Sequence, residues 1–223
     1  AHSPIQQLPW SQPCLTIEPT RMVSDDQIEQ IHRQSLKVLE EIGMDVVYPE
    51  ARDIFAKAGA IVEGDRVRIG RDIVEEALKT PPTEFTFHAR NPHHNIRIGG
   101  RWIAFAPVGG PPNCSDLDRG RRPGTLEDNG NFVKLSQFFN CIHTAGGGSV
   151  DALDVHASIR HLHIMRNKVR FSDKVPFVVS TGRHRLFDSL EIARIARGIS
   201  REQLLREPST YTVINTNSPL KLD

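Results

Sequence analysis

The second half of the chain carries a regular series of short apolar runs, each followed by a polar or glycine-rich turn. The four runs span residues 102–107, 141–145, 176–180 and 211–215. They recur at roughly 34 to 39 residues, and helical patterns separate the last three. A strand, a loop and a helix at this spacing are typical of parallel βα units.

The turns that follow these runs are the first candidates for a ligand site, because βα architectures bind ligands just beyond the ends of their strands. These turns contain Gly109-Gly110, Gly146-Gly147-Gly148, Thr181 to His184, and Asn217-Ser218-Pro219. We expect them to gather around one common mouth. A phosphate cradle is not favoured for the triple glycine, since no Gly-Lys-Ser/Thr follows it.

The first half of the chain predicts an arm and an extension. Residues 1–22 are rich in proline, glutamine and serine and predict an extended arm that wraps a neighbour. Residues 23–101 predict a helical extension with a small antiparallel sheet, and residues 102–223 carry the parallel units. Within the extension, the expected helices are 24–43, 49–59 and 72–79, and the expected strands are 67–69, 85–88, 95–98 and 102–105.

The fold class expected from this order is α/β, as the first half of a (β/α)8 TIM barrel with about four βα units. The helices expected among these units are 125–139, 154–168 and 186–196, with a short one after Ser200. A closed barrel needs a comparable length beyond Asp223. We therefore expect a longer protein, or else two copies that complete each other, and we favour the first.

Composition excludes some classes of partner. The net charge is +1, from 28 basic and 27 acidic residues, so nucleic acid is not an expected partner. No apolar run is long enough to span a membrane, and the first residues lack the pattern of a signal peptide. Cys14, Cys114 and Cys141 lie far apart, which favours reduced thiols. We expect a cytoplasmic protein.

Several long segments resemble the trimethylamine methyltransferase (MttB-like) family. The opening helix is similar at IHRQSLKVLEEIGMDV, and the next segments at AGAIVEGDRVRI and EEALKTPPTEFTFHARNP. Further on, the resemblance covers IGGRWIAFAPVGGPPNCSDLDRGRRPGTLED, PFVVSTG and INTNSPLKLD. It extends over nearly all of this chain and over the first half of a typical member.

The resemblance implies a fold and an activity. Members of the family are (β/α)8 barrels with an N-terminal extension. They move a methyl group from a methylated amine to the cobalt of a corrinoid (cobalamin) that a partner protein supplies, and they often form homo-oligomers. Some members carry pyrrolysine, and relatives without it act on quaternary amines such as betaines; we favour the second subclass. The alternative is a non-catalytic half-barrel that serves as a binding or assembly module.

This chemistry makes modest demands on side chains. A quaternary ammonium group needs aromatic faces or carboxylates in a dry pocket, and the nucleophile is the cobalt, so no general base or metal ligand is required. The catalytic residues therefore remain unknown. Phe105 could line the pocket or pack in the core. Gly109, Gly110 and Gly147 could admit a ligand or simply form turns.

Polar residues after the third and fourth runs complete the predicted substrate site. Arg183 could pair with a betaine carboxylate, with His184 beside it, or it could be a solvated loop charge. Asn215 and Asn217 could bond a carboxylate or stabilise their own loop as an Asx turn.

The histidines do not predict a metal site. His161 and His163 are two residues apart and face different sides of a helix, whereas helical ligands need a spacing of four. His156 and the pair His93-His94 complete the histidine clusters, and Asp116 and Asp118 are expected in a hairpin turn. No metal is expected.

Overall fold

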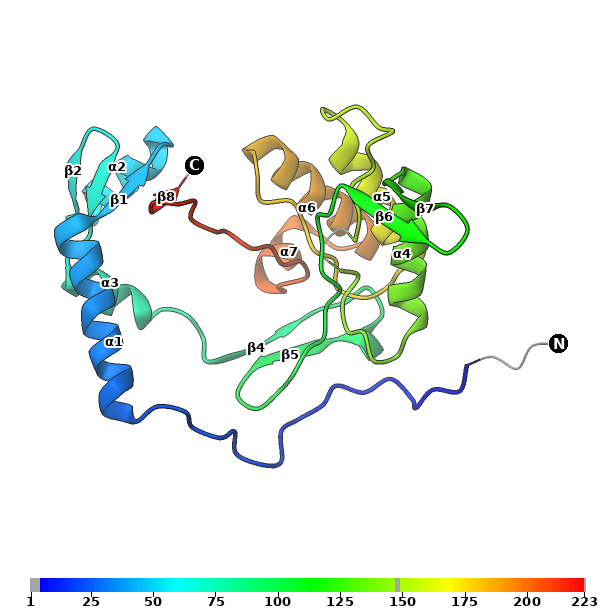
Figure 1. Ribbon diagram of the computed structural model, residues 1–223, viewed down its shortest axis with the longest axis horizontal. Coiled ribbons are helices and arrows are strands. Elements are labelled where there is room, and N and C mark those ends of the chain that lie inside the picture. The colour runs from blue at the N-terminus through cyan, green and yellow to red at the C-terminus, as the bar shows by residue number, and fades with distance from the viewer. Residues whose placement is uncertain (1–4, 147–148, 223) are drawn as a thin grey trace. The chain divides into compact units, whose positions relative to one another are not determined.

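The structure is a computed structural model that describes residues 5–146 and 149–222 (Figure 1). These residues form a mixed α/β fold with small sheets, and no barrel is closed among them. The chain forms two compact units. Unit 1 comprises Ala1–Thr16 and Thr83–Val213, and unit 2 comprises Ile17–Pro82 and Ile214–Asp223. No helix in the described ranges is long and apolar enough to cross a membrane.

Unit 2 opens with the helix that the sequence predicts. Ser24 and Gln27 form a complete capping box at the start of α1 (Asp25–Lys37), which continues as the π-helical turn η1 (Val38–Ile42). Gly43, with φ 73°, ends the segment, and a Cβ there would lie 2.4 Å from the carbonyl oxygen of Val67.

A four-stranded sheet forms the centre of unit 2, in the order β2-β3-β1-β8. Its strands are β1 (Met44–Val46), β2 (Ile61–Glu63), β3 (Arg66–Arg68) and β8 (Lys221–Leu222). β1 is antiparallel to β3 and parallel to β8. Residues from α2 (Pro49–Lys57) and α3 (Arg71–Leu78) pack against a core of Met44, Val46, Val67 and Ile69. The pairing of β8 with β1 was not predicted from the sequence.

Unit 1 contains two antiparallel hairpins and a series of helices. The hairpins are β4 (Glu84–Phe87) with β5 (Ile96–Gly99), and β6 (Asn113–Asp116) with β7 (Gly120–Pro123). The helices are α4 (Leu126–Phe138), α5 (Arg160–Phe171), α6 (Arg183–Arg197) and α7 (Arg201–Arg206), and the short turn η2 (Pro92–His94) lies between β4 and β5. α4 packs against α5, and α5 against α6.

Two sequence expectations for residues 102–160 of unit 1 are wrong. α5 begins at Arg160 instead of Asp154, because the Asp154 carboxylate accepts a hydrogen bond from the Leu126 N–H at the start of α4 (2.8 Å). Residues 102–105 do not form the expected third antiparallel strand. Trp102 makes only an isolated antiparallel bridge, with Cys14.

That bridge belongs to the N-terminal arm, which lies along unit 1. The side chain of Gln12 bonds both the N–H and the carbonyl of Arg97 (2.8 and 2.7 Å), and the Ile103 N–H donates to the carbonyl of Pro13 (3.0 Å). The arm therefore pairs with the beginning of the first apolar run of the same chain.

Candidate functional site

The first three apolar runs and the start of the fourth, up to Val213, lie next to one another in sequence order within unit 1. The first two are joined by a hydrogen bond from the His143 N–H to the carbonyl of Phe105 (2.9 Å). The later runs are joined by isolated parallel bridges, Thr144 with Val175 and Phe177 with Tyr211. The second, third and fourth runs are therefore joined in parallel, although they meet at single bridges and do not form continuous strands in the described residues. The direction of the first run relative to the second stays a prediction.

The ends of the first two runs meet. Gly146 has a φ of 77°, and a Cβ added there would lie 3.1 Å from the Pro107 side chain. Any larger residue would push the two loops apart. Gly182, with φ 85°, ends the third run and forms the N-cap of α6. Glycine is thus required at two of the turns that the sequence singles out.

Phe105 lies in a groove at the first run. Its side chain is 51% exposed, so it is not part of a buried core. The groove has a volume of about 370 Å³ and is also lined by Leu8, Cys141 and His143. Phe105 therefore presents an apolar face to an open space, which is a property that a quaternary ammonium site needs.

His143 holds Phe105 in place. Its ring stacks on that of Phe105 with centroids 5.7 Å apart, and its Nδ1 accepts a hydrogen bond from the Phe105 N–H (2.9 Å). Its Nε2 lies 3.2 Å from the carbonyl of Ser11. Burial lowers the pKa of His143, which fits a neutral ring with one accepting nitrogen and one donating nitrogen. His143 therefore acts here as a positioning residue.

Gly109 and Gly110 are exposed beyond the same run. Gly110 has a φ of 90°, and a Cβ there would meet nothing within 4 Å. This backbone is open to close approach by a flat or bulky partner, and it also forms a turn. Gly147 lies outside the described residues.

Arg183 and His184 are not in a loop, as the sequence suggested, but form the first turn of α6. Both side chains are exposed. The Arg183 guanidinium lies 5.8 Å from the centroid of the Phe187 ring on the same helix. The helix starts earlier than expected because Gly182 supplies the positive φ from which it begins.

Asn215 and Asn217 belong to unit 2, whereas Phe105, Gly109, Gly110, Arg183 and His184 belong to unit 1. Asn217 pairs with Lys221 through two backbone hydrogen bonds of 2.7 and 2.9 Å. Both asparagines are exposed. A common mouth that includes them remains a prediction.

A pair of hydroxyl groups between the second and fourth runs was not predicted from the sequence. Thr144 Oγ1 and Tyr211 Oη lie 2.9 Å apart and join the second run to the fourth. Burial raises the pKa of Tyr211, and its ring contacts Phe177 (5.3 Å) and Phe87 (6.0 Å). Lone polar residues within apolar runs are the signal that could have identified this pair.

A buried lysine precedes the third run. The Lys174 ammonium donates to three carbonyls at or just beyond the end of α4, those of Ser136 (2.7 Å), Phe139 (3.0 Å) and Ile142 (2.7 Å). Lys174 is 3% exposed, and burial lowers its pKa to about 8. It thus satisfies the Ser136 carbonyl in the last turn of α4 and ties that helix end to the loop that follows, where the Phe139 carbonyl also accepts the Ile142 N–H (3.1 Å).

The neighbouring Asp173 collects hydrogen bonds from other elements. It accepts from Asn91 (3.0 Å) and Gln137 (2.9 Å), and it lies 2.6 Å from His94 Nδ1. Burial alone would raise the pKa of Asp173, but these hydrogen bonds hold it below its ordinary value. The start of the third run is therefore anchored by a buried polar network.

The described residues contain no group of three or more His, Cys, Asp or Glu side chains that could hold a metal ion. His161 bonds Asp188 (2.8 Å), and Asp116 bonds the backbone of Asp118 within the β6–β7 turn, as expected of a hairpin residue. The three cysteines are free; Cys114 is buried, whereas Cys14 and Cys141 are exposed.

Comparison with known proteins identifies the family. The model of the trimethylamine methyltransferase (MTTB) family matches residues 1–223. The chain belongs to this family. It is 39% identical over 202 residues to glycine betaine methyltransferase of Desulfitobacterium hafniense (strain Y51). The matched segment is 91% of this chain and 42% of that protein.

Other relatives carry related names. The chain is 33% identical over 137 residues to the proline betaine:corrinoid methyltransferase of Eubacterium limosum (60% of this chain, 28% of that protein). It is 26% identical over 202 residues to trimethylamine methyltransferase MttB of Desulfitobacterium hafniense (strain DSM 10664 / DCB-2), which covers 89% of this chain and 40% of that protein. The chain thus spans about two fifths or less of these curated relatives.

Proposed function

We propose that the protein transfers a methyl group from a quaternary amine, such as a betaine, to the cobalt of a corrinoid that a separate protein supplies. The observation that carries this proposal is the 39% identity to a glycine betaine methyltransferase across 91% of the chain, within a family match over its whole length. Relatives named for proline betaine and L-carnitine support a quaternary amine as substrate.

The chemistry of the proposed reaction is a displacement at carbon. The bond between nitrogen and the methyl carbon breaks, the methyl group passes to the reduced cobalt, and a neutral tertiary amine leaves. The protein must hold the cation and exclude water, and it needs no acid or base. The half-exposed ring of Phe105 fits the first demand, and the open backbone at Gly110 fits the approach of a partner's corrin ring.

We further propose that residues 102–223 are the first half of a (β/α)8 barrel. The parallel bridges from the second run to the third and from the third to the fourth support this, as do the helices α4, α5 and α6 that alternate with the runs. The substrate would then bind where the runs end, at a mouth that includes Arg183, His184, Asn215 and Asn217. Assembly into a homo-oligomer also belongs to this proposal.

The proposal can be tested with the purified protein and a reduced corrinoid protein. Glycine betaine, proline betaine, L-carnitine and trimethylamine are titrated while the visible absorption of the corrinoid is followed. We expect the spectral change of cobalt methylation with at least one quaternary amine and a weaker response to trimethylamine. No change with any amine, despite a corrinoid that a known methyltransferase can methylate, would favour the alternative of a binding or assembly module.

A matched pair of variants tests the role of the ring. Phe105→Leu keeps an apolar side chain but removes the aromatic face, so we expect KM for the quaternary amine to rise roughly fivefold. Phe138→Leu is the control, because Phe138 on α4 is similarly exposed, at 46%. Equal effects of the two substitutions would remove Phe105 from the proposed site.

A further inference from the structure

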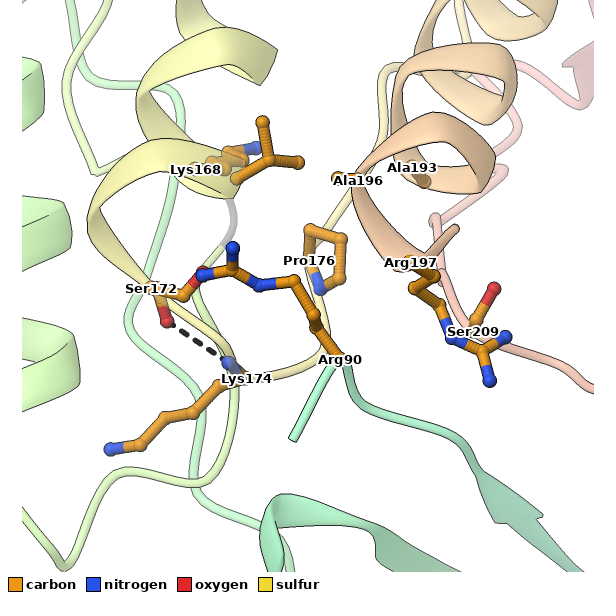
Figure 2. Close-up of a pocket in the computed structure, with 10 residues that line it drawn as sticks. Arg90, Lys168, Ser172, Lys174, Pro176, Ala193, Ala196, Arg197 and Ser209 are labelled. Atoms are coloured by element: carbon orange, nitrogen blue, oxygen red, sulfur yellow. Dashed lines mark hydrogen bonds between the residues drawn. The ribbon is translucent and has the colours of Figure 1, made fainter. Parts of the chain in front are cut away.

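A small cavity within unit 1 lies among α5, α6 and the third apolar run (Figure 2). Its volume is about 20 Å³, which is room for one water molecule or one monoatomic ion. The polar side chains that line it include Arg90, Lys168, Lys174, Arg197 and Ser209. This site is distinct from the ends of the runs and is independent of the methyl-transfer proposal.

The charge around the cavity is strongly positive. Four of the lining residues are basic, and no Asp or Glu is among the described residues that line it. Arg197 has a carboxylate partner, Glu207, at 2.6 Å. Lys168 instead donates to the carbonyl of Phe177 (2.7 Å), and burial lowers its pKa to about 8. Four basic groups with a single carboxylate partner beside Arg197 cost free energy unless a further anion lies nearby.

Two donors at the cavity have no hydrogen-bond partner among the described residues. Ser209 is 3% exposed, and its Oγ makes no hydrogen bond. The Nη1 of Arg197 is likewise buried and unbonded. Figure 2 shows these two side chains next to each other, beyond the end of α6. Buried polar atoms of this kind are rare in folded proteins and call for a ligand or a water molecule.

The other basic groups are already engaged. Figure 2 shows the Lys174 side chain directed away from Arg197, and its ammonium bonds the carbonyls beyond α4. Arg90 donates through Nη2 to the carbonyl of Ser172 (3.1 Å). These groups contribute positive potential to the cavity, whereas Arg197 and Ser209 supply the unused N–H and O–H.

We propose that this cavity binds a small monovalent anion of the size of chloride, held by Arg197 and Ser209. A water molecule must place its own protons on acceptors, and among the described side chains that line the cavity only the hydroxyls of Ser172 and Ser209 can accept. The Ser172 hydroxyl already donates to Gln137 (2.7 Å) and accepts from the Lys174 N–H (3.2 Å). An anion only accepts, which matches a lining of donors and cations. The bound anion links the end of α6 to the residue two before Tyr211, where the fourth run begins.

The negative end of the α6 dipole does not oppose this site strongly. The carbonyls of Arg194 and Ile195 in the last turn already accept hydrogen bonds from the Ile199 and Gly198 N–H groups. These bonds satisfy the helix end locally, so the guanidinium of Arg197 dominates the potential there.

The test uses the line width of the 35Cl NMR signal and the melting temperature of the protein. Sodium chloride is titrated against sodium gluconate at constant ionic strength. We expect chloride to broaden the signal through a saturable site, bromide to displace it, and the melting temperature to rise with chloride but not with gluconate. Equal melting curves in the two salts, with no saturable broadening, would overturn the proposal in favour of bound water.

Variants tie the effect to this cavity. Ser209→Ala removes the unbonded hydroxyl, and Arg197→Lys keeps the charge but removes Nη1; we expect each to weaken chloride binding roughly tenfold. Ser115→Ala is the control, because Ser115 is an exposed serine of β6. If chloride binds equally well to Ser209→Ala and Ser115→Ala, the site lies elsewhere and the proposal fails.

Discussion

The two ends of the apolar runs in unit 1 are built differently. At the start of the third run, Lys174 and Asp173 are held by hydrogen bonds to α4 and to residues around η2. Where the runs end, Gly110 faces open space, Val213 is 52% exposed, and Gly182 leads into the exposed first turn of α6. One end carries dense polar bonding, and the other carries the exposed glycines 110 and 182, with Gly146 alone buried against Pro107.

This difference suggests that the residues before the runs serve stability and the residues after them serve ligand binding. In βα architectures the residues that precede the strands hold the fold together, whereas those that follow them are free to bind ligands. Substitutions at the first end should therefore lower the free energy of unfolding, and substitutions at the second should change KM while the protein stays folded. Each prediction below tests one side of this division, in order of decreasing effect.

The largest effect is expected for Lys174→Met. Methionine keeps the apolar stem but removes the Lys174 donor from the carbonyls of Ser136 and Ile142, whereas the Phe139 carbonyl keeps the Ile142 N–H; we expect the free energy of unfolding to fall by about 3 kcal/mol. Urea unfolding followed by circular dichroism measures the change. Lys134→Met is the control on the exposed face of α4 and should cost less than about 0.5 kcal/mol. Similar losses for both variants would contradict the anchoring role.

The second prediction concerns pH and Lys168. Burial lowers its pKa from 10.5 to about 8, so between these values the unfolded chain holds a proton that the folded chain has released. The free energy of unfolding should therefore rise with pH across this window, and Lys168→Met should remove about 2 kcal/mol of that rise. Chemical denaturation at pH 8 and pH 10 checks it. Parallel curves for the two proteins would show that Lys168 does not titrate there.

Local signals explain which parts of the fold the sequence predicts. The capping boxes at Ser24 and Thr125 act over three residues, and both helices begin where the sequence places them. The start of α5 was predicted too early because Asp154 bonds the N–H of Leu126, 28 residues away. A hydrogen bond between residues so far apart in the sequence does not alter the hydrophobic periodicity from which helices are predicted.

In the candidate site too, features set by local sequence were predicted, and those set by distant partners were not. The glycines at 146 and 182 were singled out by their positions in the turns after the second and third runs, and the structure gives both positive φ values. The roles of Lys174 and His143 were not predicted, since their partners come from other elements. Arg183 was placed in a loop because the helical pattern is clearest only from Leu186, whereas backbone geometry at Gly182 starts the helix earlier.

The third prediction tests the open end with Arg183→Gln. If its guanidinium pairs with a substrate carboxylate, KM for glycine betaine should rise about tenfold, whereas KM for choline, which has no carboxylate, should stay unchanged. Arg185→Gln, on the same exposed turn of α6, is the control. Both variants should unfold within about 0.5 kcal/mol of the parent protein. An equal rise for the two substrates would exclude carboxylate pairing by Arg183.

The smallest effect is expected at the hydroxyl pair of Thr144 and Tyr211, which links the second run to the fourth. Tyr211→Phe and Thr144→Val each remove one partner of a partly buried hydrogen bond, and each should cost about 1 kcal/mol. Because each substitution removes the same bond, the double variant should be less destabilised than the sum of the two single variants. Urea unfolding of the four proteins measures this coupling. Strict additivity would mean that the second and fourth runs are held by packing alone, and that the dense bonding stops at the start of the runs.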